Sequence, residues 1–297
     1  MKTDNAASFC AQYPYQPHFF TTGGHRLAYL DEGEGPAVVL VHGNPSWSYL
    51  YRNLVARLRG TYRCIVPDHL GCGNSDKPQD ATYSLAVHID NLEALLDHLG
   101  LSRCVLVVHD WGGAIGLGWA VRHPERVAGV VALNTAAFRS SRMPRRIGLC
   151  RLPILGPLVV RGLNGFAGAS VFMAVARRMR PEVARGFLAP YNSWQNRIAL
   201  LRFVQDIPMT PDHPSWPTLV AVEEGLARLA EHPLLLCWGG RDFCFNEAFY
   251  QEWQRRFPRA EAHWFADAGH YVLEDALEEA EPLISGFLER TLGEERA

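Results

Sequence analysis

The pattern of apolar and polar residues predicts alternating strands and helices along most of the chain. Residues 18–31 alternate apolar and polar positions around Gly23-Gly24, as in a β-hairpin. A helix is expected to begin near Ser48, and apolar residues three and four positions apart predict another helix over 83–99. The continuous apolar run at 37–41 is typical of a strand covered on both faces, and 106–108 and 127–133 are expected to be buried strands as well. Further strands are expected at 64–67, 234–238 and 262–265. This β-α-β-α order predicts an α/β fold with a mostly parallel, doubly wound sheet.

The strand pattern is interrupted between residues 138 and 215, where proline, arginine and helical segments replace it. We therefore predict a core domain formed by residues 1–137 and 216–297, with a helical cap inserted at 138–215. Ligands of doubly wound sheets bind beyond the carboxyl ends of the strands, so the cap is expected to cover the site. Residues 1–17 are expected to form a poorly ordered arm.

Composition narrows the class of protein. The chain has 297 residues, of which 48% are hydrophobic and 20% charged, and this balance favours a large folded core over disorder. The net charge of −2 gives no overall attraction to nucleic acid. Its seven cysteines show no metal-binding spacing, which predicts a reduced, cytoplasmic protein without structural zinc. No signal peptide and no transmembrane segment are expected.

The strand that ends at Val108 continues into His109-Asp110-Trp111-Gly112-Gly113, and a helix rich in small residues follows. Strand, sharp turn and helix in this order are typical of the nucleophile elbow of the α/β-hydrolase fold, here with aspartate where serine is common. An aspartate in front of a helix often does no more than cap it, so the assignment depends on its partners. No G-x-S-x-G motif occurs in the chain to offer a serine nucleophile instead.

Loops after two later strands supply those partners. Asp242 ends the segment Gly239-Gly240-Arg241-Asp242, and His270 ends the segment 267–270. Nucleophile, acid and histidine in this order along the chain match the triads of α/β-hydrolases. Asp110 is expected to attack carbon directly, after which His270, held by Asp242, activates a water molecule against the ester. Asp267 and Asp275 compete for the acid position, although Asp267 is the type of residue that forms turns.

Two further residues offer hydrogen-bond donors to a leaving group. Asn44 lies in the loop after the strand 37–41, and Trp111 follows the proposed nucleophile. Their side chains are expected to bind the leaving group and their backbone N–H groups to form an oxyanion hole. Trp47 is expected to pack in the core, and His69 and His109 to have structural roles. The carboxylate, imidazole and donors suffice for this chemistry, so no metal or organic cofactor is expected.

Several motifs resemble those of haloalkane dehalogenases. They are HGNPSWSYLYRNL (42–54), GCGNSDKP (71–78) and VHDWGG (108–113), and the resemblance covers essentially the whole chain. It implies Asp110 as nucleophile, Asp242 as acid and His270 as base, with Asn44 and Trp111 binding the leaving group.

A narrower set of segments resembles the β-lactone decarboxylase branch of that family, which belongs to bacterial long-chain olefin biosynthesis. These segments lie at 64–73, 133–138, 189–209 and 252–258. The resemblance implies decarboxylation of cis-3,4-dialkyl β-lactones (2-oxetanones) to cis-alkenes and CO₂. It also implies a long-chain apolar substrate, and a thiolase-like condensing enzyme, a reductase and a β-lactone synthetase as partners. Attack at the ring carbon and attack at the carbonyl are both open at this point.

Other functions are weighed against this one. Haloalkane hydrolysis by the same residues is the main alternative, and a non-catalytic binding protein with the same fold is the alternative from another class. Epoxide hydrolysis ranks lower, because the enzymes of that type that the chain resembles use two cap tyrosines and 138–215 contains only Tyr191. Cap arginines alternate with apolar residues, which fits an apolar tunnel flanked by charge, docking to an acidic partner or a solvated cap surface. They are Arg139, Arg142, Arg145, Arg146, Arg151 and Arg161.

Overall fold

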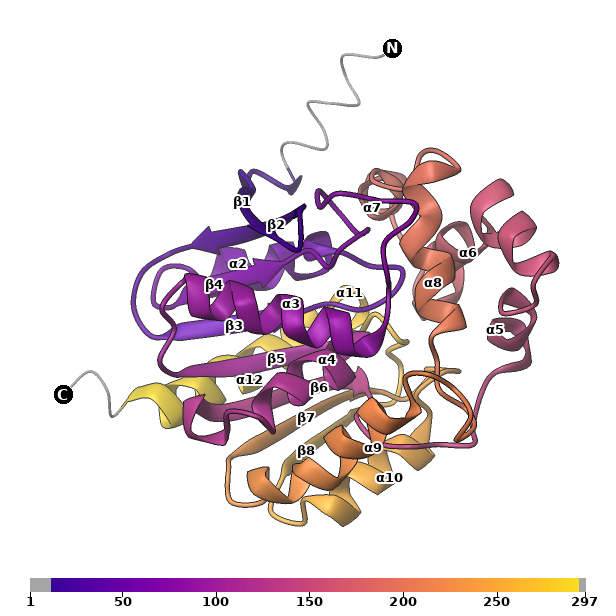
Figure 1. Cartoon of the computed structure of the whole chain (residues 1–297). Helices are drawn as coiled ribbons and strands as arrows, with labels where there is room; N and C mark the ends of the chain where they lie inside the picture. Colours follow the sequence, from indigo (N-terminus) through magenta and orange to yellow (C-terminus); the bar gives the residue numbers. More distant parts are fainter. Residues whose placement is uncertain (1–11, 294–297) are drawn as a thin grey trace.

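An eight-stranded sheet forms the centre of the computed structural model, which describes residues 12–293 (Figure 1). The strands lie in the order β1-β2-β4-β3-β5-β6-β7-β8; β1, β2 and β4 pair antiparallel, and the remaining neighbours are parallel. The strands are β1 (His18–Thr22), β2 (His25–Glu32), β3 (Ala37–Val41), β4 (Arg63–Pro67), β5 (Cys104–Asp110), β6 (Val127–Thr135), β7 (Leu234–Gly239) and β8 (Glu261–Phe265). The predicted hairpin and the mostly parallel α/β sheet are confirmed.

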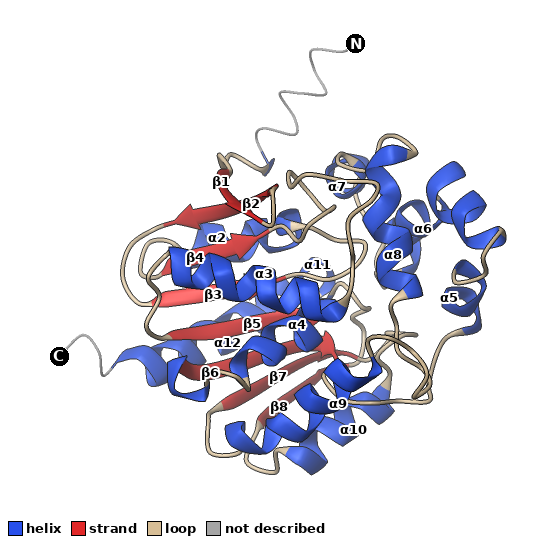
Figure 2. Ribbon diagram, viewed as in Figure 1, coloured by secondary structure: helices blue, strands red, loops and turns tan. Residues whose placement is uncertain are grey.

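Helices cover both faces of this sheet (Figure 2). Val38 and Leu40 of β3 belong to the core that includes α2 (Arg52–Leu58) and α12 (Leu277–Leu292). Val39 and Val41 belong to the opposite core, which includes α3 (Leu85–His98) and α4 (Trp111–Ala120). Because successive side chains of a strand point to opposite faces, an apolar residue is needed at every position of such a strand. This explains the continuous apolar runs in the sequence.

The remaining helices of the two layers connect or follow the strands. They are η1 (Ser48–Tyr51), η2 (Pro124–Arg126), α9 (Trp216–Gly225), η5 (Leu226–Leu229), α10 (Glu247–Arg256) and α11 (Val272–Asp275). The helix predicted over 83–99 begins after Ser84, whose side chain accepts a hydrogen bond from the backbone N–H of Val87 and so caps α3.

A helical segment without strands separates β6 from β7. It contains α5 (Arg145–Cys150), η3 (Pro157–Gly162), α6 (Gly165–Met173), α7 (Pro181–Leu188), η4 (Gln195–Arg197) and α8 (Ile198–Gln205). In Figure 1 these helices lie beyond the end of the sheet at which β5 and β6 terminate. The boundaries 138 and 215 stay predictions.

The N-terminal arm differs from its prediction. Residues 1–11 lie outside the described residues, but residues 12–17 are packed against the domain. Tyr13 and Tyr15 are buried; the Tyr13 hydroxyl lies 2.6 Å from Ser48 Oγ, and the Tyr15 hydroxyl donates to the Arg52 carbonyl oxygen. Two aromatic rings bury enough apolar surface to order a short segment that has no periodic pattern of its own. No helix in the range 12–293 is long and apolar enough to cross a membrane.

Candidate active site

Asp110 occupies a sharp turn between β5 and α4. Its φ is 53°, a left-handed value that is uncommon for residues other than glycine, and its backbone oxygen accepts a hydrogen bond from the Thr135 hydroxyl. Helix α4 starts directly at the next residue and packs close to β3, because Gly112 lies where any Cβ would collide with the Val41 carbonyl. The turn directs the Asp110 side chain into a cavity beyond the sheet.

The Asp110 carboxylate is buried and held by backbone donors. The backbone N–H of Asn44 donates to Asp110 Oδ1 at 2.6 Å. Burial raises the pKa of Asp110, while the charge of His270 and the backbone N–H groups of Asn44 and Trp111 oppose that rise. Gly43 is part of the same arrangement, since a Cβ at that position would overlap the carboxylate. The carboxylate therefore rests against N–H groups that favour its ionised form.

His270 lies between the two acids. Its Nδ1 is 2.7 Å from Asp242 Oδ2, and its Nε2 is 3.7 Å from Asp110 Oδ2. Burial alone would lower the pKa of His270, but the charge of Asp242, the hydrogen bond to it and the charge of Asp110 together raise it. The structure thus brings together the three residues that the sequence places on separate loops.

Asn134 completes this group, and the sequence analysis gave it no role. It is the penultimate residue of β6, its φ is 36°, and its Nδ2 donates to Asp242 Oδ2 at 3.0 Å. The same Nδ2 also donates to the carbonyl oxygen of Gly239 at the end of β7, and the Asn134 Oδ1 accepts a hydrogen bond from the Gly239 N–H. The backbone N–H of Cys244 donates to the other Asp242 oxygen at 2.7 Å. A polar residue at the end of a buried strand is the only sequence signal that could have indicated Asn134.

The two expected leaving-group donors line the cavity beside Asp110, with one difference from expectation. The Trp111 indole, whose ring lies 5.2 Å from that of Phe203, makes no hydrogen bond with any residue in the range 12–293. One amide hydrogen of Asn44, however, is taken by the Leu200 carbonyl oxygen at 3.2 Å. The Asn44 Oδ1 is buried and has no partner in the described structure. Only the second Asn44 hydrogen is left for a ligand.

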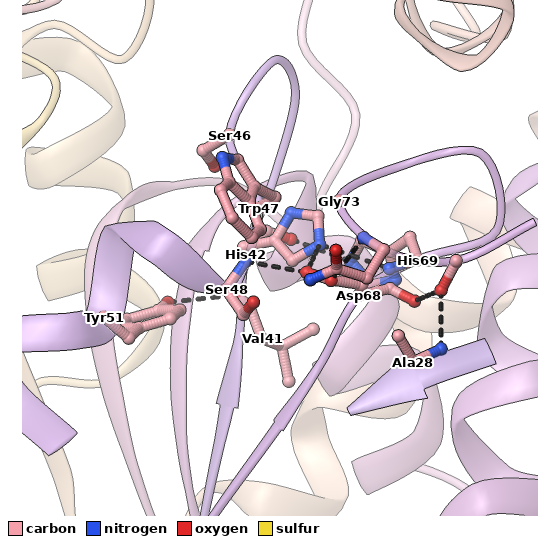
Figure 3. Close-up of polar contacts among 12 residues, drawn as sticks. Ala28, Val41, His42, Ser46, Trp47, Ser48, Tyr51, Asp68, His69 and Gly73 are labelled. Carbon is pink, nitrogen blue, oxygen red and sulfur yellow. Dashed lines mark hydrogen bonds and ion pairs between the residues drawn. The ribbon is translucent and has the colours of Figure 1, made fainter. Parts of the chain in front are cut away.

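A buried polar network supports the loop that carries Asn44 (Figure 3). Asp68 accepts hydrogen bonds from the backbone N–H groups of Ser48 and Asn74, each at 2.8 Å. His69 Nε2 lies 2.8 Å from the His42 carbonyl oxygen, and the backbone N–H of His69 donates to His42 Nε2. Burial raises the pKa of Asp68 to about 6 and lowers the pKa of His69 to about 4. These groups therefore hold the loop in place, and none of them lines the cavity.

The other polar candidates contact the protein rather than the cavity. His109 Nε2 lies 2.9 Å from the His270 carbonyl oxygen, and the Trp47 indole donates to the Gly186 carbonyl oxygen. Asp267 is exposed and pairs with Arg241. Asp275 accepts hydrogen bonds from the backbone of Gly269, Ala176 and Arg177. Neither acid contacts the imidazole of His270, which leaves Asp242 as its carboxylate partner in the described structure.

The cavity has a volume of about 460 Å³ and is mainly apolar. Its polar end is formed by Asn44, Asp110, Trp111 and His270. Side chains from the helices α5, α6 and α8 provide much of the remaining lining, among them Ile147, Phe166, Met173 and Val204. Within residues 12–293, no group of His, Cys, Asp and Glu side chains is arranged to hold a metal ion. The site places a buried carboxylate at one end of a mainly apolar cavity.

Comparisons with known proteins agree with this geometry. A family profile described as the alpha/beta hydrolase fold matches residues 36–277. The chain is 46% identical to a cis-3-alkyl-4-alkyloxetan-2-one decarboxylase of Shewanella oneidensis, over 94% of this chain and 90% of the relative. It is 32% identical to haloalkane dehalogenase 2 of Mycobacterium bovis, over 89% and 92%. The crystal structure of a haloalkane dehalogenase from Agrobacterium tumefaciens superposes with a TM-score of 0.83 at 27% identity, covering 96% of this chain and 99% of the other.

Proposed function

This chain belongs to the haloalkane dehalogenase family of α/β-hydrolases, and we propose that it decarboxylates cis-3,4-dialkyl β-lactones to cis-alkenes and CO₂. The observation that carries the proposal is the Asp110 carboxylate at the polar end of a mainly apolar cavity. A dialkyl lactone has the matching shape, with one strained polar ring between two hydrocarbon chains. The similarity to the decarboxylase of Shewanella oneidensis supports this substrate class.

In the first step, ionised Asp110 attacks the β-carbon of the lactone, which carries the ring oxygen. A bond forms between this carbon and the carboxylate, and the strained ring bond breaks with its electron pair on the ring oxygen. The result is an ester of Asp110 and a free carboxylate on the substrate. We assign the Trp111 indole N–H and the second amide hydrogen of Asn44, both in the cavity lining, as the donors that receive this new charge.

In the second step, the ester collapses without water. The bond between the substrate's α-carbon and its carboxylate breaks, and this electron pair forms the double bond to the β-carbon. The ester bond to Asp110 breaks at the same time, which releases CO₂ and returns the carboxylate. Attack from the back inverts the β-carbon and places the ester oxygen anti to the substrate carboxylate. Anti elimination then gives a cis-alkene from a cis-lactone, and no proton or oxidant is consumed.

His270 and Asp242 have a different role in this scheme. No proton is transferred on the way to the alkene, so a water-activating base is not required in every turnover. We assign His270, held by Asp242 at 2.7 Å, to the hydrolysis of esters that do not collapse. We therefore expect His270→Gln to reduce alkene formation much less than Asp110→Asn does.

The cap and the cellular setting belong to the same proposal. Residues 138–215 are assigned to a lid that supplies much of the apolar lining, and the described residues on either side of it to the catalytic core. Six cysteines in the described part of the chain are free thiols, which supports a reducing, cytoplasmic setting. A thiolase-like condensing enzyme, a reductase and a β-lactone synthetase would supply the substrate.

The experiment is product analysis with a synthetic cis-dialkyl β-lactone. We expect gas chromatography with mass spectrometry to detect the cis-alkene, with one CO₂ for each alkene. Asp110→Asn keeps the shape of the side chain but removes the nucleophile, so ligand binding should persist while turnover is lost. Formation of a β-hydroxy acid without alkene, or unchanged turnover in Asp110→Asn, would contradict the proposal.

Haloalkane hydrolysis is the second candidate, because the His270–Asp242 pair is a water-activating arrangement that decarboxylation does not need. Release of bromide from 1-bromobutane at useful rates, without alkene from the lactone, would make hydrolysis the main activity. Epoxide hydrolysis has less support, since the hydroxyl of Tyr191 is buried and donates to the Ser46 carbonyl oxygen. Retained ligand binding without any turnover in the wild-type protein would favour a non-catalytic binding protein.

A further inference from the structure

Positive charge is concentrated in one part of the helical segment. No acidic residue occurs between Glu125 and Glu182, whereas nine arginines occur between residues 139 and 180. Because the whole chain has a net charge of −2 and this segment carries +9, the rest of the chain carries −11. The arginines are Arg139, Arg142, Arg145, Arg146, Arg151, Arg161, Arg177, Arg178 and Arg180.

Most of this charge is not neutralised within the protein. Arg139 pairs with Glu223, and Arg180 pairs with Glu182. The other seven form no ion pair with any carboxylate in the range 12–293, and the side chains of Arg145, Arg177 and Arg178 are exposed. These charges are therefore available to an anionic partner.

Large apolar side chains are exposed in the same segment. We call six of them the cap-tip patch: Leu149, Leu152, Ile154, Leu158, Leu163 and Phe172. Ile154 is 86% exposed, Leu163 73% and Phe172 68%, which are the three largest values among the exposed large apolar residues of the described chain. The patch runs along α5, η3 and α6, and Figure 1 shows α5 and α6 on the side of the cap away from the sheet. Exposed apolar residues gathered in this way mark a binding surface.

The patch is continuous with the entrance of the active-site cavity. Leu149 and Leu155 line the cavity and are also exposed to solvent. Arg142 and Arg146 are exposed and line it as well, and Arg146 reaches Met173 at the end of α6. The cavity therefore opens between apolar and arginine side chains of this surface. A hydrocarbon ligand that leaves the cavity here meets the patch first.

We infer that the cap-tip patch and its arginines dock the protein on an anionic lipid surface, with the cavity entrance facing the lipid. Aliphatic side chains enter the interface, and the arginines contact phosphate headgroups. A lipid surface is the partner that matches both components at once, because it offers phosphate headgroups to the arginines and acyl chains to the exposed aliphatic side chains. The inference rests on the proposed function in one respect: a dialkyl lactone and its alkene both dissolve in a bilayer, so docking there shortens their transfer.

Sedimentation with lipid vesicles tests the docking without any turnover. We expect the wild-type protein to bind vesicles of phosphatidylcholine that contain phosphatidylglycerol, to bind pure phosphatidylcholine weakly, and to be released by salt. Each arginine near such a surface contributes about a fivefold factor in affinity, so Arg145→Ser/Arg177→Ser/Arg178→Ser should weaken binding about 100-fold. The control Arg59→Ser/Arg255→Ser/Arg290→Ser removes the same charge outside this segment and should have little effect.

The apolar component has its own variant. We expect Ile154→Ser/Leu163→Ser/Phe172→Ser to weaken vesicle binding at least about tenfold, since apolar burial anchors interfacial segments. Phe19→Ser, which truncates an exposed aromatic residue of β1, is the control. All the changed side chains are on the surface and none lines the cavity, so thermal unfolding should match that of the wild type.

Turnover separates failure of the docking from failure of the proposed function. The apolar variant should convert a short-chain, water-soluble β-lactone as fast as the wild type does, but a vesicle-embedded long-chain lactone more slowly. Wild-type protein that converts the soluble lactone but binds no anionic vesicles would overturn the docking alone. A dimer that forms without lipid and is lost in the apolar variant would also overturn it, as would binding to an acidic protein alone. Absence of any lactone turnover would contradict the proposed function and leave the vesicle result intact.

Discussion

Replacement of Asn134 by alanine tests whether the pair of Asp242 and His270 is held in place by a buried hydrogen-bond clamp. The Asn134 amide donates to Asp242 Oδ2 and to the Gly239 carbonyl oxygen, and its Oδ1 accepts from the Gly239 N–H at 2.7 Å. The alanine variant deprives both Gly239 backbone groups of these partners in a fully buried position. The Gly239 carbonyl oxygen keeps the backbone N–H of Asp242 at 3.3 Å, so the Gly239 N–H is the group left unsatisfied. Since an unsatisfied buried group costs about 1–3 kcal/mol, we expect the free energy of unfolding to fall by about 1–3 kcal/mol.

A glycine variant separates the amide from the backbone. Asn134 has a φ of 36°, where alanine carries a steric cost of about 1–2 kcal/mol that glycine does not. Glycine instead loses about 0.5–1 kcal/mol more chain entropy on folding. The two variants should therefore be destabilised to within about 1 kcal/mol of each other. The loss that they share belongs to the amide.

Urea titration with a common slope for all three proteins measures these differences. Product formation is then measured at a temperature at which each variant stays folded. For the hydrolysis of 1-bromobutane, we expect kcat to fall by a larger factor than KM rises. The reason is that Asp242 keeps its contacts with His270 and Cys244 but loses its contact with Asn134. If both variants lose less than about 1 kcal/mol, the Gly239 groups have found other partners and the clamp is wrong.

Four further predictions concern the chemistry. Burial raises the pKa of Asp110, so alkene formation, which needs the ionised carboxylate, should decline on acidification at a pH above the ordinary aspartate value of about 3.9. Despite burial, the charges of Asp242 and Asp110 raise the pKa of His270. Hydrolysis of 1-bromobutane, which needs the neutral imidazole, should therefore rise only above about pH 6.5. Coincident pH profiles for alkene formation and for hydrolysis would contradict this. Gly43→Ala should reduce kcat about 100-fold by displacing the carboxylate, whereas Gly60→Ala, which adds a Cβ in open space, should leave kcat unchanged. Trp111→Phe should lower kcat/KM for the lactone about 100- to 1000-fold, and retained kcat/KM would exclude the indole as a donor to the leaving carboxylate.

The sequence predicts most of the sheet, because a strand covered on both faces needs apolar residues at every position. The runs 37–41 and 234–238 agree with β3 and β7 to within one residue. The same reasoning fails for residues 12–17, where only tertiary contacts of Tyr13 and Tyr15 give order. A segment that is ordered by another part of the chain has no periodic pattern to read.

The same distinction, between sequence patterns that can be read and tertiary contacts that cannot, applies to the candidate site. The order of Asp110, Asp242 and His270 along the chain is readable, because parallel strands bring their carboxyl ends to one edge of the sheet. The hydrogen bond that Asn44 makes with the Leu200 carbonyl oxygen is not readable, since it joins residues 156 positions apart. The contact of Asn134 with Asp242 spans 108 positions and is hidden for the same reason. Long-range hydrogen bonds of this kind depend on register and packing, which motifs do not specify.

In the proposed scheme the same residues would serve both candidate reactions, so the substrate would decide between them. A lactone opened by Asp110 leaves a carboxylate next to the ester, and this carboxylate provides the electron pair for collapse. An alkyl halide leaves no such group, so its ester persists until a water molecule is activated by His270, whose Nε2 lies 3.7 Å from Asp110 Oδ2. Collapse is unimolecular, whereas hydrolysis needs a water molecule in a cavity lined mainly by hydrocarbon. Decarboxylation of a lactone therefore precedes hydrolysis of its ester even with an intact triad, and the presence of His270 and Asp242 does not by itself identify a hydrolase.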